Sequence, residues 1–144
     1  MLGDSDPQVR SDVALAIVNV PSDKVDDVPS PELQLIERAI PLLVNLLKDG
    51  NTQVERDAGW SLGNRVVDWV LRNRQDYDIV LDIQQKLAQH SDAANRELVA
   101  SYWAWNARSL PGVASRARPL LSQLATDADD TVRGLAEQAL SYLK

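Results

Sequence analysis

The sequence predicts an all-α fold built from tandem helix pairs, because one short pattern recurs four times and the same capping residues precede every copy. The copies read VRSDVALAI, VERDAGWSL, NRELVASYW and VRGLAEQAL, and they begin at Val9, Val54, Asn95 and Val132. Successive copies are 45, 41 and 37 residues apart. A repeat of this length is typical of proteins in which each helix pair buries its apolar face against neighbouring pairs.

A helix start is predicted at the same place in every copy. The residues three positions before the copies are Asp6, Asn51, Asp92 and Asp129. Asp and Asn are preferred N-caps because the side-chain oxygen accepts a hydrogen bond from a free N–H of the first turn. Pro7 follows the first of these caps and suits the first helical position. Two positions further upstream stand Asp4, Asp49, His90 and Asp127, so we expect His90 to have a structural role in its turn.

A second, weaker pattern precedes the capped turns and predicts the first helix of each pair. It reads IPLLVNLLKD over Ile40 to Asp49 and RPLLSQLATD over Arg118 to Asp127, and LDIQQKLAQH keeps the apolar spacing in the copy between them. Pro41 and Pro119 each remove a backbone donor within a helical pattern, which bends a helix. Each repeat is therefore predicted as a bent first helix, a tight turn and a second helix.

The predicted elements cover most of the chain and include no strand. Helices are expected at about 7–19, 32–48, 52–73, 76–89, 93–109, 113–125 and 130–143. We expect one domain over residues 1–144, made of a half repeat (1–20), a loop (21–31) and repeats at about 32–74, 75–110 and 111–144. The loop contains three Pro and is longer than usual connections between packed helices, so it is interpreted as a surface insertion.

The pattern resembles that of HEAT-repeat proteins. That family has Pro-Leu-Leu in the first helix, Asp in the turn and Val-Arg at the start of the second helix, and Ile40 to Leu62 and Arg118 to Leu140 match it best. The resemblance implies a right-handed α-α superhelix, a solenoid of about three and a half helix pairs, with the second helices side by side on its concave face. The first copy is only a half repeat, so we expect apolar surface at Val9, Val13 and Ile17 to be poorly covered.

Composition excludes several classes of function. The net charge is −6 and Lys and Arg do not cluster, so nucleic acid is not an expected partner. The chain has no Cys and a single His, so no metal site is expected, and no cofactor motif is found. No apolar run is long enough for a membrane span and the first ten residues do not resemble a signal peptide, so a cytoplasmic protein is expected.

Candidate binding residues lie on one stripe of the second helices. In the second copy, Val54, Ala58 and Leu62 form a core stripe, and Trp103 and Trp69 are also expected to pack inside. A different stripe is polar and aromatic, and it comprises Arg56, Trp60, Asn64, Ser101, Trp105, Arg108, Gln138 and Tyr142. The stretch DAGWSLGN, with Trp60 and Asn64, resembles the armadillo-repeat segment in which a Trp and an Asn hold an extended peptide.

The predicted function is a non-enzymatic protein-interaction or scaffold module that binds a peptide or helix along the concave groove. One alternative is an enzyme or enzyme subunit resembling HEAT-like bilin lyases or alkylpurine DNA glycosylases, for which Asp57 and Trp60 invite comparison. Another is a unit of a longer solenoid, or a homo-oligomer joined through the N-terminal helix. The acidic residues Asp76, Asp78 and Asp82 surround a predicted helix start and are interpreted as capping and solvated groups.

Overall fold

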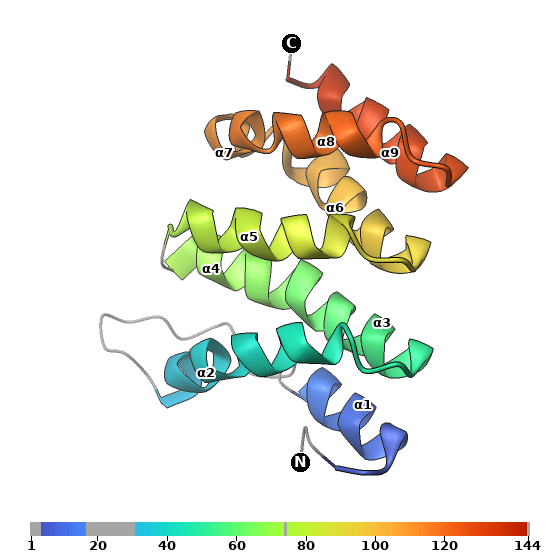
Figure 1. The fold of residues 1–144 in the computed structure, drawn as a ribbon. Helices are drawn as coiled ribbons and strands as arrows, with labels where there is room; N and C mark the ends of the chain where they lie inside the picture. The colour runs from blue at the N-terminus through green and yellow to red at the C-terminus, as the bar shows by residue number, and fades with distance from the viewer. Residues whose placement is uncertain (1–3, 17–30, 74, 144) are drawn as a thin grey trace. The chain divides into compact units, whose positions relative to one another are not determined.

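The computed structural model describes residues 4–16, 31–73 and 75–143, with only the backbone of 31–33, and all regular structure in these ranges is helical (Figure 1). The chain forms two compact units, Met1–Asp76 and Tyr77–Lys144, which are described separately as the N-terminal and C-terminal units. The boundary lies next to the predicted repeat end at residue 74. The single domain over residues 1–144 stays a prediction.

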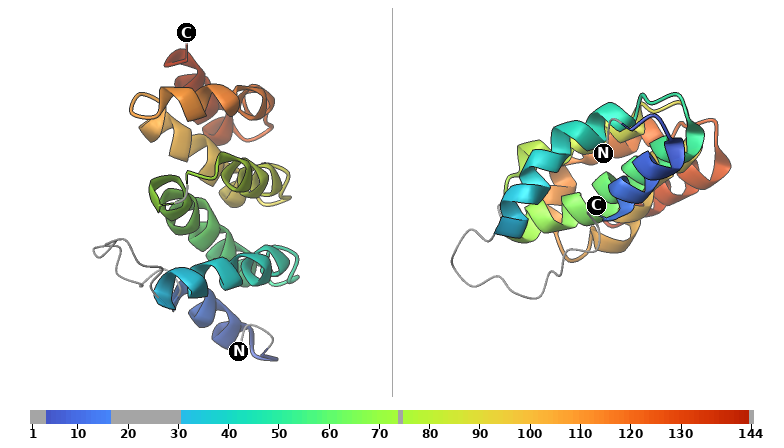
Figure 2. Two further views of the ribbon diagram at one scale, coloured as in Figure 1. Left: turned by 90° about the vertical axis from the view of Figure 1, so that its left-hand side faces the viewer. Right: turned by 90° about the horizontal axis from the view of Figure 1, so that it is seen from below.

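The N-terminal unit consists of two short layers of helix around one core. Its elements are α1 (Pro7–Ala16), α2 (Pro31–Leu46), α3 (Thr52–Trp60), the π-helix η2 (Ser61–Val66) and α4 (Val67–Asn73). The helices α1 and α2 both pack on α3, and α2 also contacts η2 (Figures 1 and 2). Residues 17–19 of the first predicted helix, and residues 21–30 of the predicted loop, lie outside the described residues.

The helical run made of α3, η2 and α4 contains a π-helical turn that the sequence did not predict. The helical run over 52–73 is continuous as predicted, but the Val67 N–H donates to the Leu62 carbonyl five residues earlier. Ser61 at the start of η2 is buried, and its hydroxyl donates to the Ala14 carbonyl near the end of α1 at 2.7 Å. The hydroxyl thus satisfies a carbonyl that the helix end leaves without an intrahelical partner.

The C-terminal unit repeats the arrangement of first and second helices. Its elements are α5 (Tyr77–Ala88), α6 (Ala93–Asn106), α7 (Pro111–Arg116), α8 (Arg118–Leu124) and α9 (Asp130–Ser141). The second helices α6 and α9 lie side by side, α5 packs on α6, and α8 packs on α9. The predicted helices at 32–48, 76–89, 93–109 and 130–143 are found with ends within three residues of the prediction.

The prediction of one helix over 113–125 is wrong, because the chain there forms α7 and α8 with a break at Ala117. Pro119, the second residue of α8, has no backbone donor, and its ring would collide with the carbonyl four residues earlier if one helix ran through it. Pro41, in contrast, lies inside α2, which continues through it and changes direction along its length (Figure 1).

The predicted N-caps are confirmed in all four copies. The Asn51 side chain accepts from the backbone N–H groups of Gln53 and Val54, and the Asp129 side chain accepts from Thr131 and Val132. The corresponding oxygens of Asp6 and Asp92 accept from the N–H two residues further on, at 2.9 Å and 3.0 Å. Each second helix therefore begins where its capping residue places it.

The predicted core stripe is also confirmed. Val54, Ala58 and Leu62 are fully buried in the N-terminal unit, and Trp69 is buried near the end of the same helical run. In the C-terminal unit, Trp103 is fully buried, and its indole N–H donates to the side-chain amide oxygen of Gln84 at 2.8 Å. Within the described residues, no helix is long and apolar enough to span a membrane.

Candidate binding surface

Two Trp residues of α6 lie on opposite sides of the helix. Trp103 and Trp105 are two residues apart, which is about 200° around an α-helix. Trp103 is 0% exposed, whereas Trp105 is 82% exposed and is the most exposed large apolar side chain among the described residues. The side chain of Trp105 is therefore largely exposed to solvent.

Two of the predicted residues, Arg108 and Tyr142, meet just after the ends of α6 and α9. The guanidinium carbon of Arg108 lies 4.1 Å from the centroid of the Tyr142 ring. The Gln138 side-chain amide, one turn before Tyr142 on α9, donates to the Tyr142 hydroxyl at 3.2 Å. Tyr142 and Trp105 occupy the same position of the aligned copies, on two helices that pack together. We call Trp105, Arg108, Gln138 and Tyr142 the Trp105 surface.

Ser101 belongs to the predicted stripe but contributes less to this surface. Its side chain is half-buried, and its hydroxyl donates to the Leu98 carbonyl within α6 at 3.2 Å. A hydroxyl that already donates to its own helix has only its acceptor capacity left for a partner.

The N-terminal unit carries the remaining predicted residues on one helical run. Arg56 is exposed, Trp60 is 40% exposed, and Asn64 is half-buried within the π-helical turn. We call these three residues the Trp60 surface. It belongs to a different unit from the Trp105 surface, and each surface is considered by itself.

The chemistry of the Trp105 surface suits contact with another polypeptide. A stacked Arg–Tyr pair and an exposed indole offer flat faces that accept aliphatic or cationic side chains. The Gln138 carboxamide can donate to and accept from a peptide backbone. Trp, Tyr and Arg are the residues that most often dominate the binding energy at protein interfaces.

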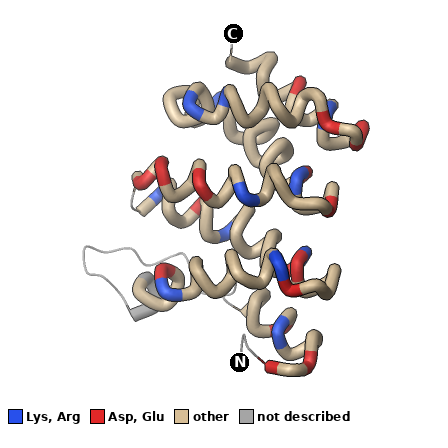
Figure 3. The backbone as a smooth tube through the Cα atoms, in the orientation of Figure 1, with Lys and Arg blue, Asp and Glu red and all other residues tan. Residues whose placement is uncertain are grey.

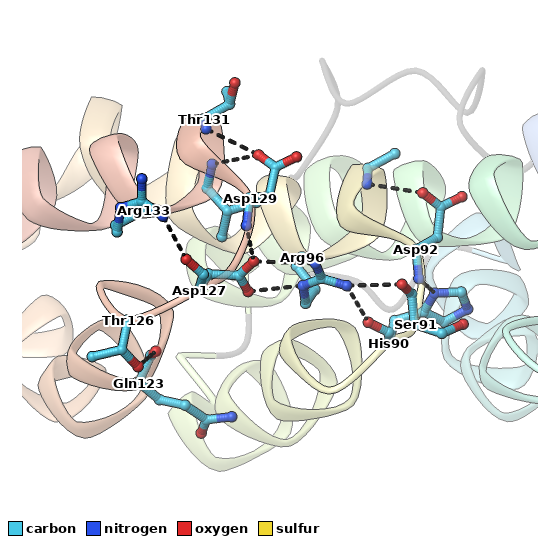
Figure 4. Close-up of polar contacts among 12 residues, drawn as sticks. His90, Ser91, Asp92, Arg96, Gln123, Thr126, Asp127, Asp129, Thr131 and Arg133 are labelled. Carbon is cyan, nitrogen blue, oxygen red and sulfur yellow. Dashed lines mark hydrogen bonds and ion pairs between the residues drawn. The ribbon is translucent and has the colours of Figure 1, made fainter.

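A network of turn contacts holds the two second helices of the C-terminal unit together (Figure 4). Arg96 on α6 forms a two-pronged ion pair with Asp127 in the turn before α9, at 2.8 Å and 3.1 Å. The same guanidinium donates to the carbonyls of His90 and Ser91 in its own turn. The pKa of Asp127 is lowered, mainly by this hydrogen bond from Arg96, and that of Arg96 is raised by the same contact.

The N-terminal unit contains the same ion pair at the same positions of the repeat. Arg10 donates to both carboxylate oxygens of Asp49, at 2.8 Å and 2.9 Å, and to the Asp4 carbonyl at 2.6 Å. The hydrogen bond from Arg10 lowers the pKa of Asp49. Figure 3 shows acidic and basic residues close together at the turns before α3 and α9. We call the two contacts, Arg10 with Asp49 and Arg96 with Asp127, the turn ion pairs.

The structural role predicted for His90 is confirmed. Its ring Nδ1 accepts from the Asp92 backbone N–H at 3.0 Å. In the equivalent turns, Asp4 and Asp127 accept from the N–H two residues further on at 2.9 Å. The His ring thus provides the acceptor that Asp provides elsewhere, and in the neutral ring this places the proton on Nε2.

Stability should fall with acidification because the turn ion pairs hold ionised carboxylates. The pKa values of Asp49 and Asp127 are lower in the folded chain than their ordinary values, so the unfolded chain binds more protons at acid pH. The two ion pairs therefore contribute fully to the free energy of unfolding above the ordinary pKa of Asp. Their contribution is lost as the pH drops from about 5 through the pKa values of the folded chain. Urea unfolding at a series of pH values measures this slope.

A matched pair of variants separates the turn ion pair from general acid effects. Asp127→Asn should cost about 1–2 kcal/mol at neutral pH and flatten the acid slope. Asp82→Asn removes the carboxylate that pairs with Lys86 on the exposed face of α5, and should change stability by less than about 0.5 kcal/mol. An unchanged acid slope in the Asp127 variant would contradict the role assigned to this pair.

Two of the acidic residues near the start of α5, which the sequence analysis interpreted as capping and solvated groups, form ion pairs. Asp78 forms an ion pair with Arg116 at 2.6 Å, and Asp82 forms one with Lys86 at 2.6 Å. Across residues 4–16, 31–73 and 75–143, no group of three or more His, Asp or Glu side chains is arranged to hold a metal ion.

Comparison with known proteins shows a similarity of fold to a solved structure. No protein-family model matches the sequence, and no curated protein matches it. The chain is similar to the crystal structure of an engineered protein from the Northeast Structural Genomics Consortium, with a TM-score of 0.59 and 19% sequence identity. The match covers 99% of this chain and 59% of that one, so the chain spans about three-fifths of its length. At this identity the likeness concerns the fold alone.

Proposed function

We propose that this chain is a protein-interaction module that binds an extended peptide or a helix through the Trp105 surface. The Trp60 surface is proposed as a second contact of the same kind. The observation that carries the proposal is the 82% exposure of Trp105 near the end of α6, the helix that the stacked Arg108 follows.

Exposure of this indole contrasts with the treatment of other large side chains in the same unit. Trp103 and Tyr102, on the same helix, are buried, and their rings meet edge to face with centroids 5.1 Å apart. Leaving Trp105 in water forgoes the free energy that burial of its large apolar area would release. A partner that covers the indole recovers that free energy, which is why such residues serve as interface anchors.

Each residue of the surface has a distinct proposed role. Trp105 is the anchor against which an apolar or cationic side chain of the partner packs. Arg108 is held over Tyr142, so its charge is fixed before the partner arrives and less side-chain entropy is lost on binding. Gln138 sets the register by pairing with the partner backbone.

The HEAT-type solenoid is part of the same proposal. Support comes from the recurring N-caps, from the packing of α1 on α3 and of α6 on α9, and from the turn ion pair found once in each unit. In such a solenoid the second helices would line a concave groove, and the binding residues would form a row along it.

A peptide selection tests the proposal and does not require a named partner. A phage-displayed library of random peptides is selected on the full chain and, in parallel, on a Trp60→Ala, Trp105→Ala double variant. We expect peptides that are enriched on the full chain and that fail to bind the variant.

A control variant removes exposed apolar surface elsewhere. Leu42 on α2 is 47% exposed, and Leu42→Ala should leave binding of the selected peptides unchanged. Peptides that bind the double variant as well as the full chain would contradict the proposal. Circular dichroism of all three proteins shows whether they are equally folded.

A further inference from the structure

Gly134 is a glycine inside a helix for which the packing of the chain gives no reason. It lies in the interior of α9, and it is exposed. A Gly at such a position is less favourable than Ala, because the unfolded chain has more backbone freedom to lose. A Cβ atom at Gly134 would meet no side chain and no neighbouring element within 4 Å. The chain therefore has room for a side chain at a position that carries none.

The other glycines among the described residues differ from Gly134 in burial or in position. Gly50 has a φ of +90° in the turn before α3, a conformation that favours Gly. Gly59 and Gly63 are buried in the helical run of α3 and η2. Gly112 follows Pro111 in the first turn of α7, outside a helix interior. Of the described glycines, Gly134 alone is both exposed and inside a helix.

Gly134 lies on the side of α9 that carries two residues of the Trp105 surface. Gln138 is four residues after Gly134, and Tyr142, which caps the end of α9, is four residues after Gln138. Residues four apart are neighbours on the surface of a helix, and the hydrogen bond from Gln138 to the Tyr142 hydroxyl shows this contact directly. The exposed Gln138 side chain is therefore next to a patch of helix surface that has no side chain.

A patch of this kind admits the main chain of a partner. Because Gly has no Cβ, another backbone can approach the helix more closely there than at any other residue type. The hydrogen bond to Tyr142 uses one N–H of the Gln138 carboxamide and leaves one N–H and the oxygen for a partner. An extended chain has free N–H and C=O groups that can pair with them, whereas those of a helix are bonded within the helix.

We propose that Gly134 determines the specificity of the Trp105 surface, because it admits the main chain of an extended peptide beside Gln138. A side chain at this position would hold the main chain of the partner away from the Gln138 carboxamide. The surface then selects an extended partner over a helical one. This inference rests on the proposed function and narrows its two kinds of partner to one.

Gly134→Ala should separate folding from binding. Ala favours the helix and fits the open space, so the variant should melt about 2–4 °C higher than the original chain. The probe is the peptide most enriched on the full chain in the phage selection, made synthetically. Its affinity, measured by isothermal titration calorimetry, should fall at least about fivefold in this variant, and at least about thirtyfold in Gly134→Leu. Weaker binding by a more stable variant is not explained by unfolding.

Gly112→Ala is the matched control, because Gly112 is also exposed and a Cβ atom there would also meet nothing within 4 Å. This variant should bind the peptide within about twofold of the original chain. The conformation of the bound peptide is measured separately by transferred nuclear Overhauser spectra. An extended peptide gives strong cross-peaks from each Hα to the next N–H, whereas a helical peptide gives strong cross-peaks between successive N–H groups.

The outcomes distinguish this inference from the proposed function. A peptide that loses affinity for Trp105→Ala but binds both Gly134 variants as well as the original chain would overturn the role of Gly134 and leave the proposed function standing. A peptide that is helical when bound would do the same. A selection that enriches no peptide dependent on Trp105 would overturn both.

Discussion

Replacing Trp103 with Ala should lower the free energy of unfolding by about 3–5 kcal/mol. The side chain is fully buried in the C-terminal unit, so its removal leaves a cavity that the surrounding helices can only partly close. The buried side-chain amide oxygen of Gln84 also loses its donor, the Trp103 indole N–H at 2.8 Å. Urea unfolding followed by circular dichroism measures the change.

Trp105→Ala is the matched control, because the same substitution is made two residues away on the same helix. Trp105 is 82% exposed, so this variant should unfold within about 0.5 kcal/mol of the original chain. Trp103→Phe should fall between the two, since it keeps most of the packing but leaves Gln84 without the hydrogen bond. Equal losses of stability in the two Ala variants would contradict the opposite placement of the two indoles.

The second large effect is expected in binding. Trp105→Ala should weaken binding of a selected peptide by about 2 kcal/mol, which is about thirtyfold, because truncation removes the anchor of the surface. Isothermal titration calorimetry measures this loss. Leu42→Ala should change the affinity by less than about twofold, although it also truncates an exposed apolar side chain.

Variants of the stacked pair distinguish an anchor from a supporting contact. Arg108→Ala removes both the charge and the contact with the Tyr142 ring, and its cost should be coupled to that of Tyr142→Ala by about 0.5–1 kcal/mol. A coupling near zero would mean that the stacked geometry does not contribute to binding. Full affinity in the Trp105 variant would remove this surface from consideration.

Much of the fold could be predicted from local sequence because its signals are short and repeated. A side-chain acceptor three residues before each copy determines where a second helix begins, and all four predicted caps make the expected hydrogen bonds. The spacing of Val54, Ala58 and Leu62 identified the buried face, because residues four apart share a side of a helix. The structural role of His90 was predicted correctly because the equivalent position before the other three copies holds Asp.

Features that depend on contacts between distant residues were missed. The turn ion pairs join residues 39 and 31 positions apart. The second position of the copies and the turn position, each taken alone, did not show that Arg10 and Arg96 reach the Asp of the following turn. Comparing the second position of each copy with the turn position before the next copy would have revealed the pairing. The π-helical turn at Ser61 was hidden because the long helix continues through it with the same apolar stripe.

The candidate site was predictable as a set of residues but not as an arrangement. The stripe identified Trp60 and Trp105 without deciding whether they are exposed, because residue type alone favours burial of Trp. The structure exposes both, and it shows Arg108 stacked on Tyr142, a contact between the segments after α6 and α9 that the stripe did not reveal.

The central claim is that a peptide partner covers the indole of Trp105, and the side-chain N–H signals of the Trp residues test it most directly. These signals are recorded by nitrogen-15 NMR during titration with a selected peptide, and the Trp105 signal is assigned by its loss in Trp105→Phe. We expect the Trp105 signal to shift in proportion to occupancy, while that of the buried Trp103 stays in place. A Trp105 signal that does not move at saturating peptide would contradict the account.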